Sequence, residues 1–224
     1  MLGSVGPGTK LPTLGHAPFV ALRDAYTEQV LGMLEGGVDA VLIETSQDLL
    51  QAKAAVLASH AAMAELHTRV PIFVSVTVET TGTMLVGTDI AAAGAIIHAL
   101  DVPIMGLNCA TGPQEMAGHV KWLSEHWPGM ISVLPNAGLP EMHQGHVHFP
   151  LSPNDMAKWL ERFLKEDGIN IVGGCCGTNE AHIAAINAML ERQSANKKRP
   201  APTPRTHHWI PAVASLFQQE PLRQ

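Results

Sequence analysis

Residues 169–178 read INIVGGCCGT, so two adjacent cysteines follow a short apolar run and a pair of glycines. The glycines allow a sharp turn. A helical pattern rich in Ala and Ile begins directly afterwards, with Thr178 predicted as its cap and Glu180 near its positive end. Cys175 and Cys176 are therefore expected where a buried parallel strand turns into a helix, a position that lowers the pKa of a thiol.

Cys109, the third and last cysteine of the chain, also follows an apolar run, in residues 102–108. All three cysteines thus fall at the ends of predicted strands. Three cysteines, two of them adjacent, make a poor disulfide framework, and in a reducing compartment such residues more often bind metal or act in catalysis. The sequence therefore indicates a metal or thiol site that draws on two separate strands.

Strands are predicted to begin near residues 40, 72, 102, 130 and 169, and a spacing of about 30 residues matches one βαβ unit. Helices are predicted between them, with Asp89 and Ser152 as caps and with Pro113 and Pro153 in first turns. Continuous apolar strands that alternate with helices indicate a parallel sheet covered by helices. The sequence therefore predicts an α/β fold.

Polar side chains gather just past the carboxyl ends of these strands, namely Glu44, Glu79, Asn108, Cys109, Asn136, Cys175 and Cys176. In a (β/α) barrel all of these ends open onto one face, which carries the chemistry of barrel enzymes. A doubly wound open sheet is the alternative, but it more often carries a Gly-rich phosphate loop, and the sequence has no such motif. We therefore predict a TIM (β/α)8-type barrel.

The predicted barrel is incomplete. Residues 1–193 form the predicted partial barrel, with about five to six of the eight strands of a full one and at most a strand stub at residues 2–4. We expect an N-terminal truncation that leaves an open edge at the strand near residue 169 and poor cover beside the strand near residue 40. Residues 194–224 are rich in Lys, Arg and Pro and are predicted to form a linker, whose apolar patch at 209–217 is expected to dock.

The composition excludes several classes of protein. The 224 residues are 46% hydrophobic and 15% charged, as is typical of a globular chain. The net charge of −6 disfavours nucleic-acid binding and a polybasic membrane anchor. No apolar run reaches the roughly 18–20 residues of a transmembrane helix, and no signal peptide pattern is present. We expect a cytoplasmic protein with no nucleic-acid or membrane partner.

Five stretches together resemble the homocysteine S-methyltransferase family, and within it the homocysteine-binding barrel of the cobalamin-dependent methionine synthases. They are Gly3-Ser4-Val5-Gly6-Pro7, Glu44-Thr45 with Asp48, Gly106-Leu107-Asn108-Cys109, Asn136-Ala137-Gly138-Leu139-Pro140 and Gly173-Gly174-Cys175-Cys176-Gly177-Thr178. The resemblance implies that Cys109, Cys175 and Cys176 bind one Zn²⁺. It also implies that Glu44 holds the amino group of homocysteine and that Asn136 shapes the same pocket.

The resemblance implies a methyltransferase in which homocysteine binds as a zinc thiolate and accepts a methyl group to give methionine. Three protein ligands and one open position match a catalytic zinc site. Cobalamin and methyltetrahydrofolate are implied only for the full-length enzyme, whose folate and cobalamin modules would follow residues 194–224.

Two other interpretations stay open. The chain could be a catalytically incomplete fragment that binds zinc and a thiol but needs the missing strands or a partner chain. A redox role for Cys175 and Cys176 is weaker, since the C-x-x-C spacing is absent. Three alternating histidines in residues 142–148 are expected to be ordinary residues of a surface loop rather than metal ligands.

Overall fold

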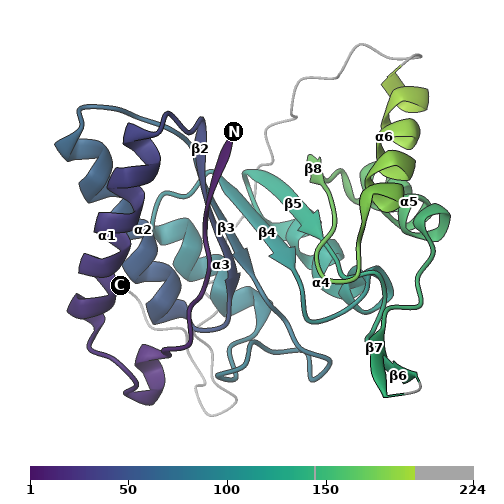
Figure 1. The fold of residues 1–224 in the computed structure, drawn as a ribbon, viewed down its shortest axis with the longest axis horizontal. Helices are drawn as coiled ribbons and strands as arrows, with labels where there is room; N and C mark the ends of the chain where they lie inside the picture. Colours follow the sequence, from purple (N-terminus) through teal and green to yellow (C-terminus); the bar gives the residue numbers. More distant parts are fainter. Residues whose placement is uncertain (144, 195–224) are drawn as a thin grey trace.

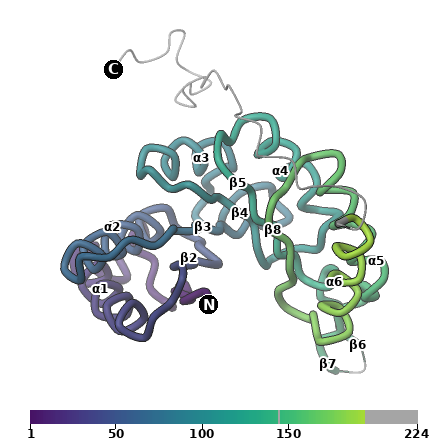
Figure 2. The backbone as a smooth tube through the Cα atoms, turned by 90° about the horizontal axis from the view of Figure 1, so that it is seen from above, coloured from purple at the N-terminus to yellow at the C-terminus, as the bar shows by residue number. Residues whose placement is uncertain are grey.

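The computed structural model describes residues 1–143 and 145–194. In this part of the chain, parallel strands form a sheet in the order β1-β2-β3-β4-β5-β8. The strands are β1 (Leu2–Val5), β2 (Ala40–Ser46), β3 (Ile72–Val76), β4 (Ile104–Asn108), β5 (Met130–Leu134) and β8 (Ile171–Val172). The sheet curls into a half-barrel with the helices on its outer side (Figures 1 and 2). The predicted α/β fold, a truncated barrel, is confirmed.

The helices follow the strands in alternation, as predicted. They are α1 (Phe19–Glu35), α2 (Leu49–Glu65), α3 (Ile90–Ala99), α4 (Pro113–His126), α5 (Pro153–Arg162) and α6 (Glu180–Ser194), with short turns of 3-10 helix at Pro12–Leu14 and of π-helix at Phe163–Asp167. The side chains of Asp48, Asp89 and Ser152 accept amide hydrogens at the starts of α2, α3 and α5. Each cap satisfies an amide that has no partner within the helix.

The cap of α6 differs from the sequence prediction. The Thr178 hydroxyl donates to the carbonyl of Cys175 at 2.6 Å, so it closes the preceding turn instead of capping the helix. Asn179 Oδ1 accepts from the amides of Ala181 and His182, at 3.1 and 3.3 Å. Asn179 is therefore the cap, and the prediction for Thr178 is wrong because its hydroxyl is already engaged.

Strand β1 also corrects an expectation. It pairs along its whole length with β2, from Leu2 opposite Ala40 to Val5 opposite Ile43. The strand near residue 40 is therefore covered on both sides, and the expectation of poor cover was wrong, because four residues suffice to pair its backbone. Within the described residues β1 and β8 are the edge strands of the sheet, and the edge at β8 agrees with the prediction.

The core lies between the outer face of the sheet and the helices. Its strand residues are at most 3% exposed and comprise Val5, Val41, Ile43, Ile72, Val74, Val76, Met105, Leu107, Ile131 and Val133. Side chains alternate along a strand, so the inner face carries a different row, in which Ser75, Gly106 and Ser132 lie in register. Two residues further along β4, this inner face reaches Asn108 at the carboxyl end of the strand.

The segment that was predicted as a surface loop contains a small hairpin. Strands β6 (Glu141–His143) and β7 (His146–His148) pair antiparallel, and all six of their residues are exposed. The rings of His143 and His148 lie 6.3 Å apart and tilted. Residues 195–224, which include most of the predicted linker and its apolar patch, lie outside the described residues. Among the described helices, none is both long and apolar enough to cross a membrane.

Candidate metal and thiol site

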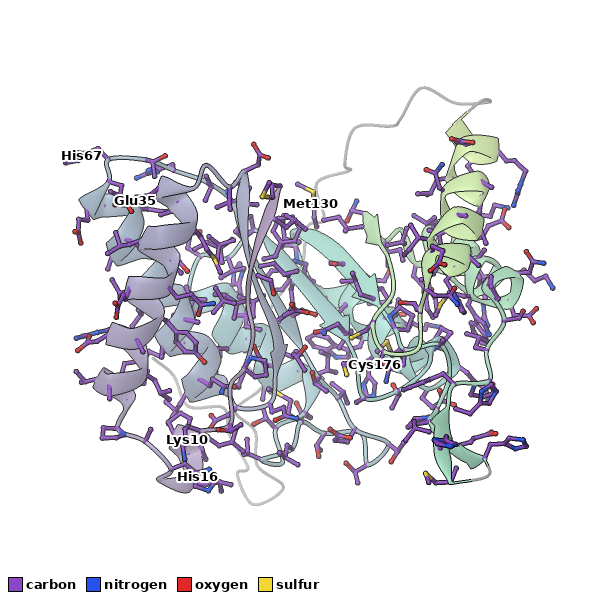
Figure 3. All side chains as sticks on the ribbon, viewed as in Figure 1. Lys10, His16, Glu35, His67, Met130 and Cys176 are labelled. Atoms are coloured by element: carbon purple, nitrogen blue, oxygen red, sulfur yellow. The ribbon has the colours of Figure 1, made fainter. Side chains whose placement is uncertain are left out.

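The fold brings the three cysteines together. Cys109 directly follows β4, whereas Cys175 and Cys176 follow β8, and β5 separates these two strands in the sheet. The three sulfur atoms lie within 4.8 Å of one another, and Cys109 Sγ is 3.7 Å from Cys176 Sγ. Figure 3 shows Cys176 at the end of the half-barrel toward which the arrows of β4 and β5 point. In the described part of the chain this is the only cluster of three or more His, Cys, Asp or Glu placed to hold a metal ion.

The last residue of β5 and the backbone directly after it hold all three cysteines in place. The hydrogen bonds run from Cys109 N to Leu134 O (3.3 Å), from Cys175 N to Pro135 O (2.8 Å) and from Ala137 N to Cys176 O (2.9 Å). Strand β5 and the residues directly after it thus support two loops. Their cysteines, Cys109 and Cys175, are 66 residues apart in the sequence.

The backbone is strained at two points of the site. Cys109 and Ala110 have φ angles of 62° and 57°, and Thr45 has a φ angle of 55°. This left-handed region costs a non-glycine residue about 1–2 kcal/mol. Thr45 lies where the register between β2 and β3 shifts, in a bulge that also contains Glu44. Strained residues and bulges are common next to functional sites, because they aim a side chain away from its regular direction.

The predicted residue Asn136 lies at the cluster. It is 3% exposed, and its Oδ1 accepts a hydrogen bond from the amide of Cys176 at 3.1 Å. Asn108 was predicted as a polar residue at a strand end and was given no role in the site, yet it contacts the cluster too, since its Nδ2 lies 3.8 Å from Cys175 Sγ. The signal for Asn108 was its position next to Cys109, at the end of a strand and on its inner face.

Glu44, the residue predicted to hold the substrate amino group, lies in the bulge of β2, two strands from Cys109. It is half-buried, and its Oε1 accepts a hydrogen bond from the hydroxyl of Ser4 on β1. The neighbouring Thr45 is hydrogen bonded to Asn108, which in turn contacts Cys175. The structure therefore connects Glu44 to the cysteine cluster through two intervening side chains.

The three thiols are electrostatically unequal. The hydrogen bond from the Cys175 thiol, with smaller help from the Ala110 amide, lowers the pKa of Cys109 to about 5. The same bond raises the pKa of Cys175, and burial raises the pKa of Cys176. The expected lowering of the pKa at Cys175 and Cys176 by a helix is therefore wrong, because α6 begins only at Glu180.

The separation of Cys109 Sγ from Cys176 Sγ matches that of two sulfur ligands on one tetrahedral metal ion. A Zn–S distance of about 2.3 Å in a tetrahedron separates neighbouring sulfur atoms by about 3.8 Å. The observed separation of 3.7 Å between Cys109 and Cys176 agrees with this value. Cys176 is exposed and the other two cysteines are half-buried, so a fourth ligand can approach from solvent. Three thiolates would suit a soft divalent cation, which would also balance their mutual repulsion.

Comparisons with known proteins identify a family and two curated relatives. The profile of a family described as homocysteine S-methyltransferase matches residues 1–190. The chain is 51% identical over 224 residues to the methionine synthase of Mycobacterium tuberculosis, and 51% identical over 227 residues to that of Mycobacterium leprae. Each match covers 100% of this chain but 18% of the relative. The chain thus spans less than a fifth of the length of these curated relatives.

The fold is also similar to that of a solved enzyme. The apo form of the homocysteine methyltransferase MmuM from Escherichia coli matches with a TM-score of 0.65 and 22% identity, over 84% of this chain and 62% of that one. Its metallated form matches with a TM-score of 0.64 and 22% identity, over 83% and 59%. At this identity the likeness supports the barrel fold alone.

Proposed function

This chain belongs to the homocysteine S-methyltransferase family, and on that premise we propose that it is the homocysteine-binding module of a methionine synthase. Cys109, Cys175 and Cys176 would hold one Zn²⁺, and homocysteine would accept a methyl group to give methionine. The observation that carries this proposal is the convergence of three sulfur atoms within 4.8 Å. When bound, zinc would lower the pKa of the homocysteine thiol, so that it reacts as a thiolate.

The residues around the cluster have assigned roles in this proposal. Glu44 would bind the ammonium group of homocysteine. Ser4 donates to Oε1 of that carboxylate, so we assign the ammonium to Oε2. Asn136 would keep the Cys176 loop in place through its bond to the Cys176 amide, and it would form one wall of the pocket.

The methyl donor and the domain division extend the same proposal. Since this chain corresponds to 18% of its relatives, the cobalamin and folate modules that supply and reload the methyl group would lie outside it. Residues 1–193 would be the partial barrel and residues 194–224 the link toward the folate-binding module. A site made of three reduced thiols suits the reducing environment of the cytoplasm.

A second candidate function rests on the open sheet. Among the described residues β8 has only two residues and one neighbour, β5, and the matched MmuM chain is longer, since 62% of it is covered. In this alternative the chain binds zinc and a thiol but transfers no methyl group until further strands complete the barrel. Methyl transfer, rather than metal binding, separates the two candidates.

X-ray absorption at the zinc edge tests the shared part of both candidates. The purified chain is expected to hold one zinc with three sulfur neighbours, and saturating homocysteine is expected to add a fourth sulfur. Glu44→Gln should keep the zinc but bind homocysteine about 10-fold or more weakly, since a charge-assisted hydrogen bond contributes about 1.5–3 kcal/mol. An unchanged sulfur count at saturating homocysteine would contradict the proposal.

Formation of methionine from homocysteine and methylcobalamin then separates the candidates. Turnover by the isolated chain supports the first. Homocysteine binding without turnover supports the second, and adding the preceding segment of the full-length protein should then restore activity.

A further inference from the structure

The side chain of Asn108 lies between two parts of the site. It is 2% exposed at the end of β4. Its Oδ1 accepts from the amide of Thr45 at 2.9 Å, and its Nδ2 donates to Thr45 Oγ1 at 2.7 Å. The same nitrogen lies 3.8 Å from Cys175 Sγ. A primary amide carries two hydrogens on nitrogen, so one can bond to the hydroxyl and the other to the sulfur.

The backbone of Asn108 is held as well. Its carbonyl accepts from the hydroxyl of Thr77 at 3.2 Å. Asn108 is therefore held at two places. Thr77 bonds to its main-chain carbonyl, and Thr45 bonds to its side-chain amide. The main-chain amide and the hydroxyl of Thr45 are both hydrogen bonded to the side-chain amide of Asn108. A shift of the Thr45 backbone is therefore expected to move that side chain.

Thr45 is a strained anchor. A β-branched residue at a φ angle of 55° is unusual, and such a conformation costs about 1–3 kcal/mol unless its surroundings hold it. The two hydrogen bonds to Asn108 stabilise this conformation of Thr45. The peptide bond before Thr45 belongs to Glu44, so the direction of the Glu44 side chain depends on the same pair of bonds.

We propose that Asn108 is a positioning residue that couples the Glu44–Thr45 bulge to the sulfur of Cys175. The inference rests on the proposed function, because it concerns Cys175 as a metal ligand. By donating a hydrogen bond to the sulfur, the amide withdraws electron density from it. The same bond also sets the direction of the sulfur, as outer hydrogen bonds do at metal sites. A contact of substrate with Glu44 is thereby transmitted to one metal ligand, while Cys109 and Cys176 receive no bond from this amide.

Cobalt substitution tests this role without any assay of activity. Co²⁺ alone is added to the metal-free full chain, and the sulfur-to-cobalt charge-transfer bands and the Co²⁺ affinity are recorded. Asn108→Ala is expected to shift these bands to longer wavelength, because the Cys175 sulfur becomes a stronger electron donor. It should also weaken Co²⁺ binding by about 10–100-fold, because the sulfur loses the partner that holds it in direction, and this loss outweighs the gain in donor strength.

Two further variants make the comparison specific. Asn187→Ala removes the same side chain and a 2.9 Å bond to Glu191 on the exposed face of α6, and it should leave the cobalt bands unchanged. Thr45→Val removes the hydroxyl that holds the amide but keeps the shape of the side chain. It should shift the bands in the same direction as Asn108→Ala, by a smaller amount.

The outcomes separate this inference from the proposed function. A wild-type chain that binds no Co²⁺ overturns the proposed metal site itself. Tight Co²⁺ binding with identical bands in wild type and Asn108→Ala leaves the metal site standing and overturns the coupling, even where thermal stability falls. If Asn108→Ala does not fold, Asn108→Ser and Thr45→Val decide, because unchanged bands in both exclude the coupling and shifted bands in both support it.

Discussion

Strands β4 and β8 both lead to cysteines of the cluster, but they differ in how firmly the protein holds them. All five residues of β4 are buried, and the strand has β3 on one side and β5 on the other. Strand β8 has two half-buried residues and a single neighbour among the described strands. Cys109 therefore follows a strand in the core of the sheet, whereas Cys175 and Cys176 follow a strand at its edge.

The difference follows from buried area. A fully buried Leu or Met contributes about 1.5–3 kcal/mol relative to an exposed one, and β4 offers Met105 and Leu107 at 0% and 1% exposure. The loop after β8 depends instead on hydrogen bonds and on a close turn. Gly177 has a φ angle of 77°, and a Cβ there would meet the Phe149 ring at 2.2 Å. A metal bound to all three cysteines would tie this edge to the centre.

The largest expected effect is a loss of zinc binding, and it should be similar for a cysteine that follows β4 and for one that follows β8. Cys109→Ala at the centre and Cys176→Ala at the edge should each weaken zinc binding by more than about 100-fold, since losing a ligand costs more than losing its outer partner. Metal analysis after dialysis measures zinc per chain, with wild type as the reference. Retention of one zinc by either variant would remove that cysteine from the ligand set.

Substitutions of apolar residues should show that β4 contributes more than β8 to the free energy of unfolding. Leu107→Ala in β4 is expected to lower the free energy of unfolding by about 2–5 kcal/mol, because it leaves a cavity in a packed interior. Val172→Ala in β8 removes less buried surface and should cost about 1 kcal/mol or less. Denaturant unfolding of the metal-free chains measures both values. Equal costs would mean that β8 is as well packed as β4.

Metal removal should act mainly on the edge. With free zinc at 100 times its Kd, binding stabilises the native chain by about 2.7 kcal/mol. A chelator should therefore speed hydrogen exchange at the amides of Gly173, Cys175 and Ala137, which bond between the β8 segment and the β5 segment. Amides in the centre of β4 serve as the internal control and should change less. Uniform loss of protection would show that the metal stabilises the sheet as a whole.

The smallest effect concerns the start of α6. Asn179→Ala should lower stability by about 1 kcal/mol, the usual cost of losing an N-cap. Ser152→Ala at the cap of α5 is the matched control and should cost a similar amount. Thermal unfolding measures both. If Asn179→Ala has no effect while Thr178→Ala does, Thr178 would be the cap after all.

Much of the fold could be predicted from local patterns. The alternation of apolar strands with helices indicated the barrel-type sheet, and the caps at Asp89 and Ser152 were confirmed. The hairpin after β5 was missed, because its alternating histidines are polar and exposed on both faces and so provide no apolar period. Strand β1 was reduced to a stub, because four residues are too few for periodicity to distinguish a strand from a loop.

The sequence by itself determined which residues end the strands, since strand periodicity and turn glycines act over neighbouring positions. It therefore placed all three cysteines, Asn108 and Asn136 at one end of a parallel sheet. Only the tertiary structure decided which of these side chains meet. The contact between Asn108 and Thr45 joins positions 63 residues apart, and that between Asn108 and Cys175 joins positions 67 apart. Such contacts depend on strand order and on the bulge in β2, neither of which has a local sequence pattern.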